Sequence, residues 1–173
     1  MQIIETSLQK QLATDCQAFV NVVNSYSDEA FNHHPDGKWS VGDVVQHLYL
    51  SARPVARLMG GPRDVFDQWG KPTAPSRTYD ELATAYEQIL TTGVKAPANM
   101  SARSEDRQEG RSIIMARFTA VYDQLIEAVG HWTEEELDNY CMPNPALGKL
   151  TVREMIYFTS IHTQHHLRLL PKP

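Results

Sequence analysis

The sequence predicts an all-α protein, a four-helix bundle with additional short helices. Apolar residues recur at helical spacing in four long stretches. Several stretches begin with a hydroxyl residue followed three positions later by an acid, which is the signature of a capped helix start. No stretch shows the apolar–polar alternation of a convincing β-strand. Because 173 residues are the length of one domain, we expect residues 1–173 to form a single helical bundle.

The first two long helices are expected on either side of a polar break. Residues from Ile3 to Val23 form the first, with apolar side chains at helical spacing: Leu8, Leu12, Cys16, Phe19 and Val23. Residues 32–38, NHHPDGK, then break the pattern with a proline and a glycine. A second helix is expected over about 40–59, with a capping serine at its start. Pro54 is expected to kink it, because it offers no N–H and its ring displaces the carbonyl of Leu50.

The remaining elements are also helices and loops. Residues 60–78, rich in Gly, Pro, Lys and Arg, are expected to form a loop, and residues 79–92 a shorter helix. A polar segment then precedes a long helix over about 107–130. Its apolar stripe consists of Ile113, Ile114, Phe118, Val121, Leu125 and Val129. A brief capped helix begins at Thr133, and the last helix is expected over about 150–170, where a proline ends it.

Two of these helix starts resemble each other. KWSVGDVVQHL (38–48) and KLTVREMIYFT (149–159) share a lysine, a large apolar residue, a hydroxyl cap, a valine and an acid at the third helical position. Half of this pattern is ordinary helix-start chemistry, so it is a weak signal of an internal repeat.

Composition and charge exclude several classes of protein. A net charge of −5 gives no basic surface for nucleic acid. No apolar run approaches the roughly 18 residues of a membrane span, and the opening MQIIETSLQKQL lacks the features of a signal peptide. Cys16 and Cys141 lie far apart and form no CxxC motif, so a disulfide between them has little support. We therefore expect a reduced, cytoplasmic protein.

The last helix carries three histidines within SIHTQHHLRLL (160–170). His162 and His166 are four residues apart and therefore share one face of the helix. The same side carries Val152, Met155, Thr159, Leu169 and Leu170. The two imidazoles are therefore expected to point into the bundle, whereas His165 is expected nearer the rim.

His47 is the candidate for a third nitrogen ligand. It lies in the second helix, at the edge of an apolar stripe formed by Val41, Val44, Leu48, Val55 and Leu58. Two histidines on one helix and one on a neighbouring helix make a compact three-nitrogen site for Zn²⁺, Ni²⁺ or Fe²⁺. Structural zinc sites normally have four protein ligands, so three histidines favour catalysis or ligand binding.

Other interpretations remain open for single residues. A lone histidine such as His47 is more often a satisfied core or boundary residue than a ligand. His33, His34 and His131 lie in expected loops or at a helix end and should be solvated or capping. Cys141 has nothing near it in sequence that would activate its thiol.

Two segments at opposite ends of the chain carry a family resemblance. GKWSVGDVVQHL and GKLTVREMIYFTSIHTQHH resemble the DinB/YfiT-like superfamily of four-helix-bundle metalloproteins. The resemblance implies a metal triad at His47, His162 and His166, occupied by zinc, nickel or a similar divalent ion. It further implies a homodimer, and an activity of either the thiol-dependent transferase or the metal-dependent hydrolase type. Residues 60–105 match no family motif.

The sequence thus predicts a divalent-metal-dependent enzyme that activates a thiol or water at a three-histidine site. Zinc or nickel is favoured over iron. The expected partner is a small-molecule thiol or electrophile, with no nucleic acid and no membrane. His165 is assigned a role beside the metal, supporting a ligand or carrying a proton. The alternative is a metal-binding or stress-response module without enzymatic activity.

Overall fold

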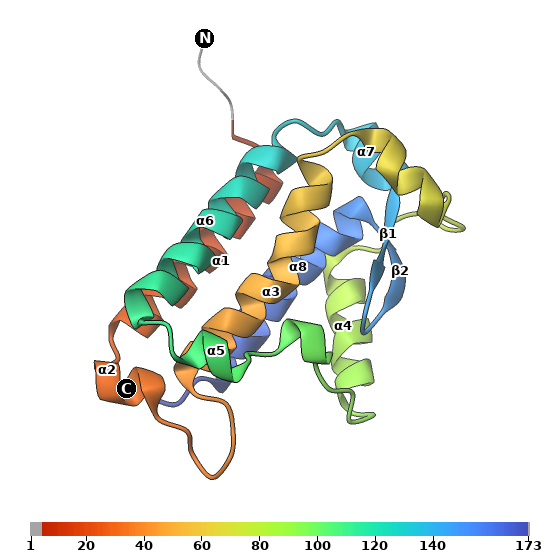
Figure 1. Cartoon of the computed structure of the whole chain (residues 1–173). Coiled ribbons are helices and arrows are strands. Elements are labelled where there is room, and N and C mark those ends of the chain that lie inside the picture. The colour runs from red at the N-terminus through yellow and green to blue at the C-terminus, as the bar shows by residue number, and fades with distance from the viewer. Residues whose placement is uncertain (1–4, 173) are drawn as a thin grey trace.

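Four long helices form the bundle in the computed structural model, which describes residues 5–172 (Figure 1). They are α1 (Ser7–Asn24), α3 (Val41–Met59), α6 (Arg111–Val129) and α8 (Val152–Leu169). The shorter helices are α2 (Asp28–Asn32), α4 (Tyr79–Leu90), α5 (Ser104–Arg107) and α7 (Glu134–Asn139), with 3-10 turns η1 (Arg63–Trp69) and η2 (Ala98–Met100). Strands β1 (Cys141–Asn144) and β2 (Gly148–Thr151) form a hairpin. The predicted all-α bundle is confirmed.

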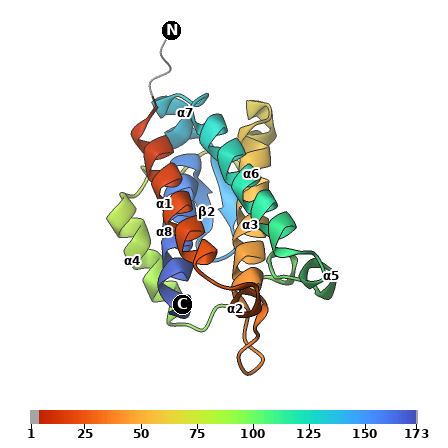
Figure 2. The same cartoon turned by 90° about the vertical axis from the view of Figure 1, so that its left-hand side faces the viewer.

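The bundle is closed on three sides and looser on the fourth. Helix α3 packs along α6, α6 along α1, and α1 along α8, whereas α3 and α8 contact each other much less. Helix α4 lies outside the bundle against α8, as Figures 1 and 2 show. The hairpin also contacts α8. The side between α3 and α8 is therefore where the fold leaves room for a site.

The core consists of the apolar stripes of the long helices. The rings of Phe19 and Phe118 lie 5.1 Å apart, centroid to centroid, and those of Phe118 and Tyr122 lie 4.6 Å apart. Each fully buried phenylalanine stabilises the fold by about 1.5–3 kcal/mol. Two residues predicted to lie on the buried apolar faces of the helices are instead exposed: Ile113 is 50% exposed and Leu169 is 66% exposed. Among residues 5–172, no helix has both the length and the apolar character that crossing a membrane requires.

Several element boundaries differ from the prediction. The first helix begins at Ser7, with Thr6 as its cap, and the Ile3 predicted within it lies outside the described residues. Helix α6 begins after Gly110 rather than near residue 107. Segment 60–78, expected to be a loop, contains η1. Helix α3 continues through Pro54 without a break.

The hairpin contradicts the expectation that the chain has no strand. Its strands have four residues each, too short to show a period in the sequence. The side-chain oxygen of Asn144 accepts hydrogen bonds from the backbone N–H groups of Ala146 and Leu147, and Gly148 adopts a φ of 75°. These turn-forming features, together with buried Met142 and Leu150, hold the hairpin against α8.

The start of α3 is fixed by a buried acid. Ser40 Oγ accepts a hydrogen bond from Asp43 N (3.0 Å), and Asp43 Oδ2 accepts one from Ser40 N (3.1 Å). The Asp43 side chain is buried, and Arg107 Nε, 64 residues further along the chain, donates to its Oδ1 at 3.0 Å. A carboxylate at this position also interacts favourably with the positive end of the helix dipole.

The start of α8 repeats this arrangement with different residues. Thr151 and Glu154 form the reciprocal cap, with distances of 3.1 and 2.9 Å. The Glu154 side chain is buried, and Arg77 Nε donates to its Oε2 at 2.6 Å. The similarity between 38–48 and 149–159 is therefore structural as well as sequential: each helix start holds a buried acid that pairs with an arginine from a distant segment.

Replacing Gly42 with alanine should destabilise the protein by about 1–3 kcal/mol. A Cβ atom at this position would lie 2.8 Å from Cε1 of Phe31, whose side chain is fully buried. The clash should outweigh the helix propensity that favours alanine over glycine by about 1 kcal/mol. Urea unfolding measures the difference.

Gly61→Ala is the matched control for this substitution. The nearest atoms to its added Cβ lie at 3.6 Å, an ordinary contact distance, so stability should change by less than about 0.5 kcal/mol. A Gly42→Ala variant as stable as the natural protein would show that Phe31 can move aside.

Candidate metal centre

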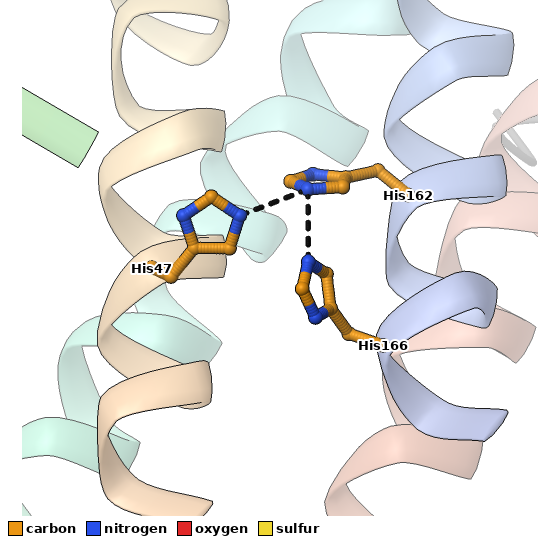
Figure 3. A group of neighbouring side chains, drawn as sticks. All are labelled: His47, His162 and His166. Atoms are coloured by element: carbon orange, nitrogen blue, oxygen red, sulfur yellow. Dashed lines mark hydrogen bonds between the residues drawn. The ribbon is translucent and has the colours of Figure 1, made fainter. Parts of the chain in front are cut away.

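The structure brings His47, His162 and His166 together between α3 and α8 (Figure 3). Nε2 of His162 lies 2.9 Å from Nε2 of His47 and 3.2 Å from Nε2 of His166. The candidate ligand atoms of the three residues all lie within 4.8 Å of one another. A tetrahedral zinc ion with Zn–N bonds of about 2.0–2.1 Å holds its nitrogens roughly 3.3–3.4 Å apart. The spacing therefore suits one small cation, although metal binding itself stays a prediction.

A backbone carbonyl fixes the orientation and tautomer of His47. Nδ1 of His47 lies 2.6 Å from the carbonyl oxygen of Met100. Because a carbonyl oxygen only accepts hydrogen bonds, Nδ1 must carry the hydrogen, and Nε2 then presents its lone pair to the site. Ligating histidines commonly have such a partner on their second nitrogen. Met100 was not predicted as part of the site, since its contribution comes from the main chain.

The three nitrogens cannot satisfy one another. Nε2 of His162 faces both His47 and His166, but a neutral ring nitrogen offers either one hydrogen or one lone pair. The remaining nitrogen is left without a partner in a buried environment, which is costly. A cation accepts all three lone pairs at once, so the donor set fits a divalent metal better than it fits a hydrogen-bonded cluster.

Burial keeps these histidines neutral. It lowers the pKa of His162 well below 6.5, and the neighbouring imidazoles His166 and His47 lower it further. Burial lowers the pKa of His166 to about 3, and the neighbouring imidazoles His47 and His165 contribute to this shift. Burial also lowers the pKa of His47, although its hydrogen bond to Met100 opposes this effect. Neutral imidazole is the form that binds metals.

The three histidines lie at the wall of a cavity of about 620 Å³. Its lining is mostly apolar, and aromatic rings flank the histidines. The Trp39 ring lies 4.9 Å from that of His47, and the Phe158 ring stacks on His162 at 5.2 Å. The volume is typical of sites that bind small molecules. A cation bound by the histidines would therefore be reachable by a ligand in the cavity and would lie beside aromatic side chains.

His165 lines the same cavity but lies outside the group of three facing nitrogens. Its ring is half-buried and packs edge-on against Tyr86 at 5.5 Å, beside His166 at 5.1 Å. Burial and the charge of Arg168 lower its pKa. This position is compatible with the predicted proton-carrying role, which stays a prediction.

The remaining candidate residues lie away from the site. His33, His34 and His131 are exposed, as expected. Cys16 and Cys141 are free and buried. Burial raises the pKa of the Cys141 thiol, and it raises that of Cys16 to about 12. Neither thiol is therefore activated as a nucleophile.

Comparison with known proteins agrees with the helical-bundle fold. The family model described as the DinB superfamily matches residues 11–170. The chain belongs to the DinB superfamily. The resemblance carried by the two histidine-bearing segments is thereby confirmed.

Individual relatives of this DinB-superfamily chain are distant. The uncharacterized protein YuaE of Bacillus subtilis (strain 168) is 27% identical over 148 residues, which cover 85% of each chain. The crystal structure of TT2238, a four-helix bundle protein, matches with a TM-score of 0.59 at 14% identity, over 94% of each chain. A mutant of the mycothiol-dependent maleylpyruvate isomerase also matches with a TM-score of 0.59, at 13% identity, over all of this chain and 64% of its own. These structural matches support the fold.

Arg107→Gln should lower the free energy of unfolding by about 1–3 kcal/mol. The substitution leaves the buried Asp43 carboxylate, at the start of the helix that carries His47, without its two hydrogen bonds from the guanidinium group. Arg103→Gln, in the same segment, is the control, because the Arg103 side chain is 70% exposed and its ion pair is screened by water. Urea unfolding should show a clear loss for the first variant and little change for the second; equal losses would contradict the assignment.

Without a metal, stability should fall as pH falls below about 6.5. The folded protein keeps His166 neutral down to about pH 3, whereas the unfolded chain takes up the proton near the ordinary value of 6.5. More protons bind to the unfolded state in this window, so stability is lost on acidification, by about 1.4 kcal/mol per pH unit for each such histidine.

Urea unfolding between pH 7 and pH 5 in the presence of a chelator measures this slope. A variant with glutamine at positions 47, 162 and 166 should lose most of it. A slope that the triple variant retains would mean that other groups cause the acid sensitivity.

Proposed function

We propose that this protein is a divalent-metal-dependent enzyme that activates a small-molecule thiol, with His47, His162 and His166 as the metal ligands. The observation that carries the proposal is the convergence of three neutral ring nitrogens at the wall of a largely apolar cavity. Three imidazole ligands suit zinc or nickel, and also iron. A divalent cation held there supplies Lewis acidity, which lowers the pKa of a thiol or water that reaches it.

The cavity lining favours a transferase over a hydrolase. Among the described residues that line it, none is Asp or Glu. Metal-dependent hydrolysis commonly uses a carboxylate to take the proton from the attacking water. A thiol is more acidic than water by several pKa units, so it needs less help from a base. The structural neighbour named as a mycothiol-dependent maleylpyruvate isomerase supports the use of a thiol, although its own reaction is an isomerisation.

The residues of the chain have distinct roles in this proposal. Met100 holds His47 in the tautomer that presents Nε2, and the rings of Trp39 and Phe158 pack against His47 and His162 and limit their rotation. His165 is the remaining imidazole in the lining, and one of its ring nitrogens accepts the proton that the thiol loses. Its lowered pKa keeps the ring neutral and able to accept.

A metal-binding module without turnover is the alternative. It is favoured by the lack of any carboxylate base in the described part of the lining, which leaves proton transfer to His165. A cobalt-substituted sample separates the two functions. A thiol should change its visible spectrum in both cases, but only an enzyme should then conjugate an electrophile such as 1-chloro-2,4-dinitrobenzene.

Replacing His47, His162 or His166 with alanine should remove most of the bound divalent metal. Each substitution takes away one of three ligands, and each leaves two neutral imidazoles without a common partner. Elemental analysis of protein purified without a metal-affinity tag measures the content. His33→Ala removes an exposed histidine and should leave the metal in place. Equal metal content in the triad variants and the control would contradict the proposed site.

Metal should stabilise the folded protein by about 2.7 kcal/mol when its free concentration is a hundred times the dissociation constant. The three nitrogens come from two helices and converge only in the folded chain. Thermal unfolding with added metal, and then with a chelator, tests this expectation. A melting temperature that does not move while the metal demonstrably leaves would show that binding is not coupled to folding.

A further inference from the structure

The charge of the cavity lining differs from that of the whole protein. The chain has 21 acidic residues among 173, so an even spread would place about 3.5 of them among the 29 residues that line the cavity. None is there. Apolar packing alone would also keep out Lys and Arg, yet Lys95 belongs to the lining. The cavity therefore combines the lack of negative charge with one fixed positive charge.

Lys95 has no carboxylate partner within residues 5–172. It lies between α4 and η2, five residues before Met100, whose carbonyl holds His47. The same segment therefore supplies the positively charged lysine and the backbone carbonyl that orients His47, a candidate metal ligand. The Lys95 side chain is exposed, as a group at the mouth of the cavity would be before a ligand arrives.

Apolar residues form most of the remaining wall. They come from α3, from α8 and from the β1–β2 hairpin, and include Leu48, Val55, Leu58, Met142, Met155 and Phe158. Such a surface stabilises the apolar body of a ligand in proportion to the apolar area removed from water. It offers nothing to an ionic group, which would remain costly to bury away from Lys95. A neutral apolar ligand would explain why the cavity wall is apolar, but it would leave Lys95 without a role.

We propose that the cavity binds an organic anion with an apolar body. Its negatively charged group pairs with Lys95 at the mouth, its body lies along the apolar wall, and its other end reaches the three histidines. This inference deepens the proposed function, on which it rests for the role of the cavity as the substrate site. The volume of about 620 Å³ accommodates a ligand of this kind.

Two fluorescent probes of nearly the same shape test the proposal. 8-Anilinonaphthalene-1-sulfonate is an apolar body with one negative charge, and N-phenyl-1-naphthylamine is the same body without the sulfonate. Their affinities are measured at low salt with a chelator present, so that a bound metal cannot attract the sulfonate. The natural protein should bind the anion at least fivefold more tightly than the neutral probe.

Substitutions then assign this preference to the cavity and to Lys95. Lys95→Gln should lower the affinity for the anionic probe about fivefold and leave the affinity for the neutral probe unchanged. Lys95→Arg should keep the preference for the anionic probe, and Lys95→Glu should reverse it. Lys10→Gln, on the exposed face of α1, should have no effect. Ala146→Trp, at a half-exposed position of the lining, should lower the affinity for both probes because the larger side chain fills part of the cavity.

The outcomes that overturn the proposal are separate from failure of the metal site. Equal affinity for the two probes, an anion preference that survives Lys95→Gln, or binding of both probes unaffected by Ala146→Trp each overturns it. Metal content is measured on the same samples without the chelator. Loss of the probe preference with metal retained rejects the anion proposal alone, whereas a protein without metal rejects the proposed function.

Discussion

Three imidazoles that face one another, two of them buried and that of His166 partly buried, are the constraint on which the rest of this structure depends. Nε2 atoms at 2.9 and 3.2 Å cannot all be satisfied by hydrogen bonds among themselves, and burial makes protonation unfavourable. The arrangement is stable only if the surrounding fold holds the rings in place or a cation joins them. Both conditions require α3 and α8 to keep a fixed rotation and height relative to each other (Figure 3).

The bundle fixes these two helices without packing them closely together. Helix α3 is held mainly by α6, and α8 by α1, so the site lies on the looser side. Each of the two helices starts at a buried acid that pairs with an arginine from a distant segment, Asp43 with Arg107 at the end of α5 and Glu154 with Arg77 in the loop before α4. These pairs fix where each helix begins, and therefore where its histidines lie. Space for a ligand remains because the strong packing occurs elsewhere.

The sequence was sufficient for the parts of the site that depend on helical periodicity. His162 and His166 share a face because they are four residues apart, and His47 follows from its place on the apolar edge of α3. The sequence was not sufficient to predict the contact between Met100 and His47, because every residue has a carbonyl group and only the fold determines which one lies beside His47. The β1–β2 hairpin was missed for a related reason, since its short strands are stabilised by contacts with α8 and η1.

The distribution of carboxylates connects the stability of the fold with the chemistry of the site. The protein has a net charge of −5, yet two of its buried acids, Asp43 and Glu154, are engaged at helix starts, where backbone N–H groups and arginines stabilise them. A carboxylate turned into the cavity instead would compete with the histidines for the cation, and it would repel an anionic ligand. The same pairs that determine where α3 and α8 begin thus keep these two acids away from the cavity, which leaves its chemistry to neutral imidazoles and a single lysine.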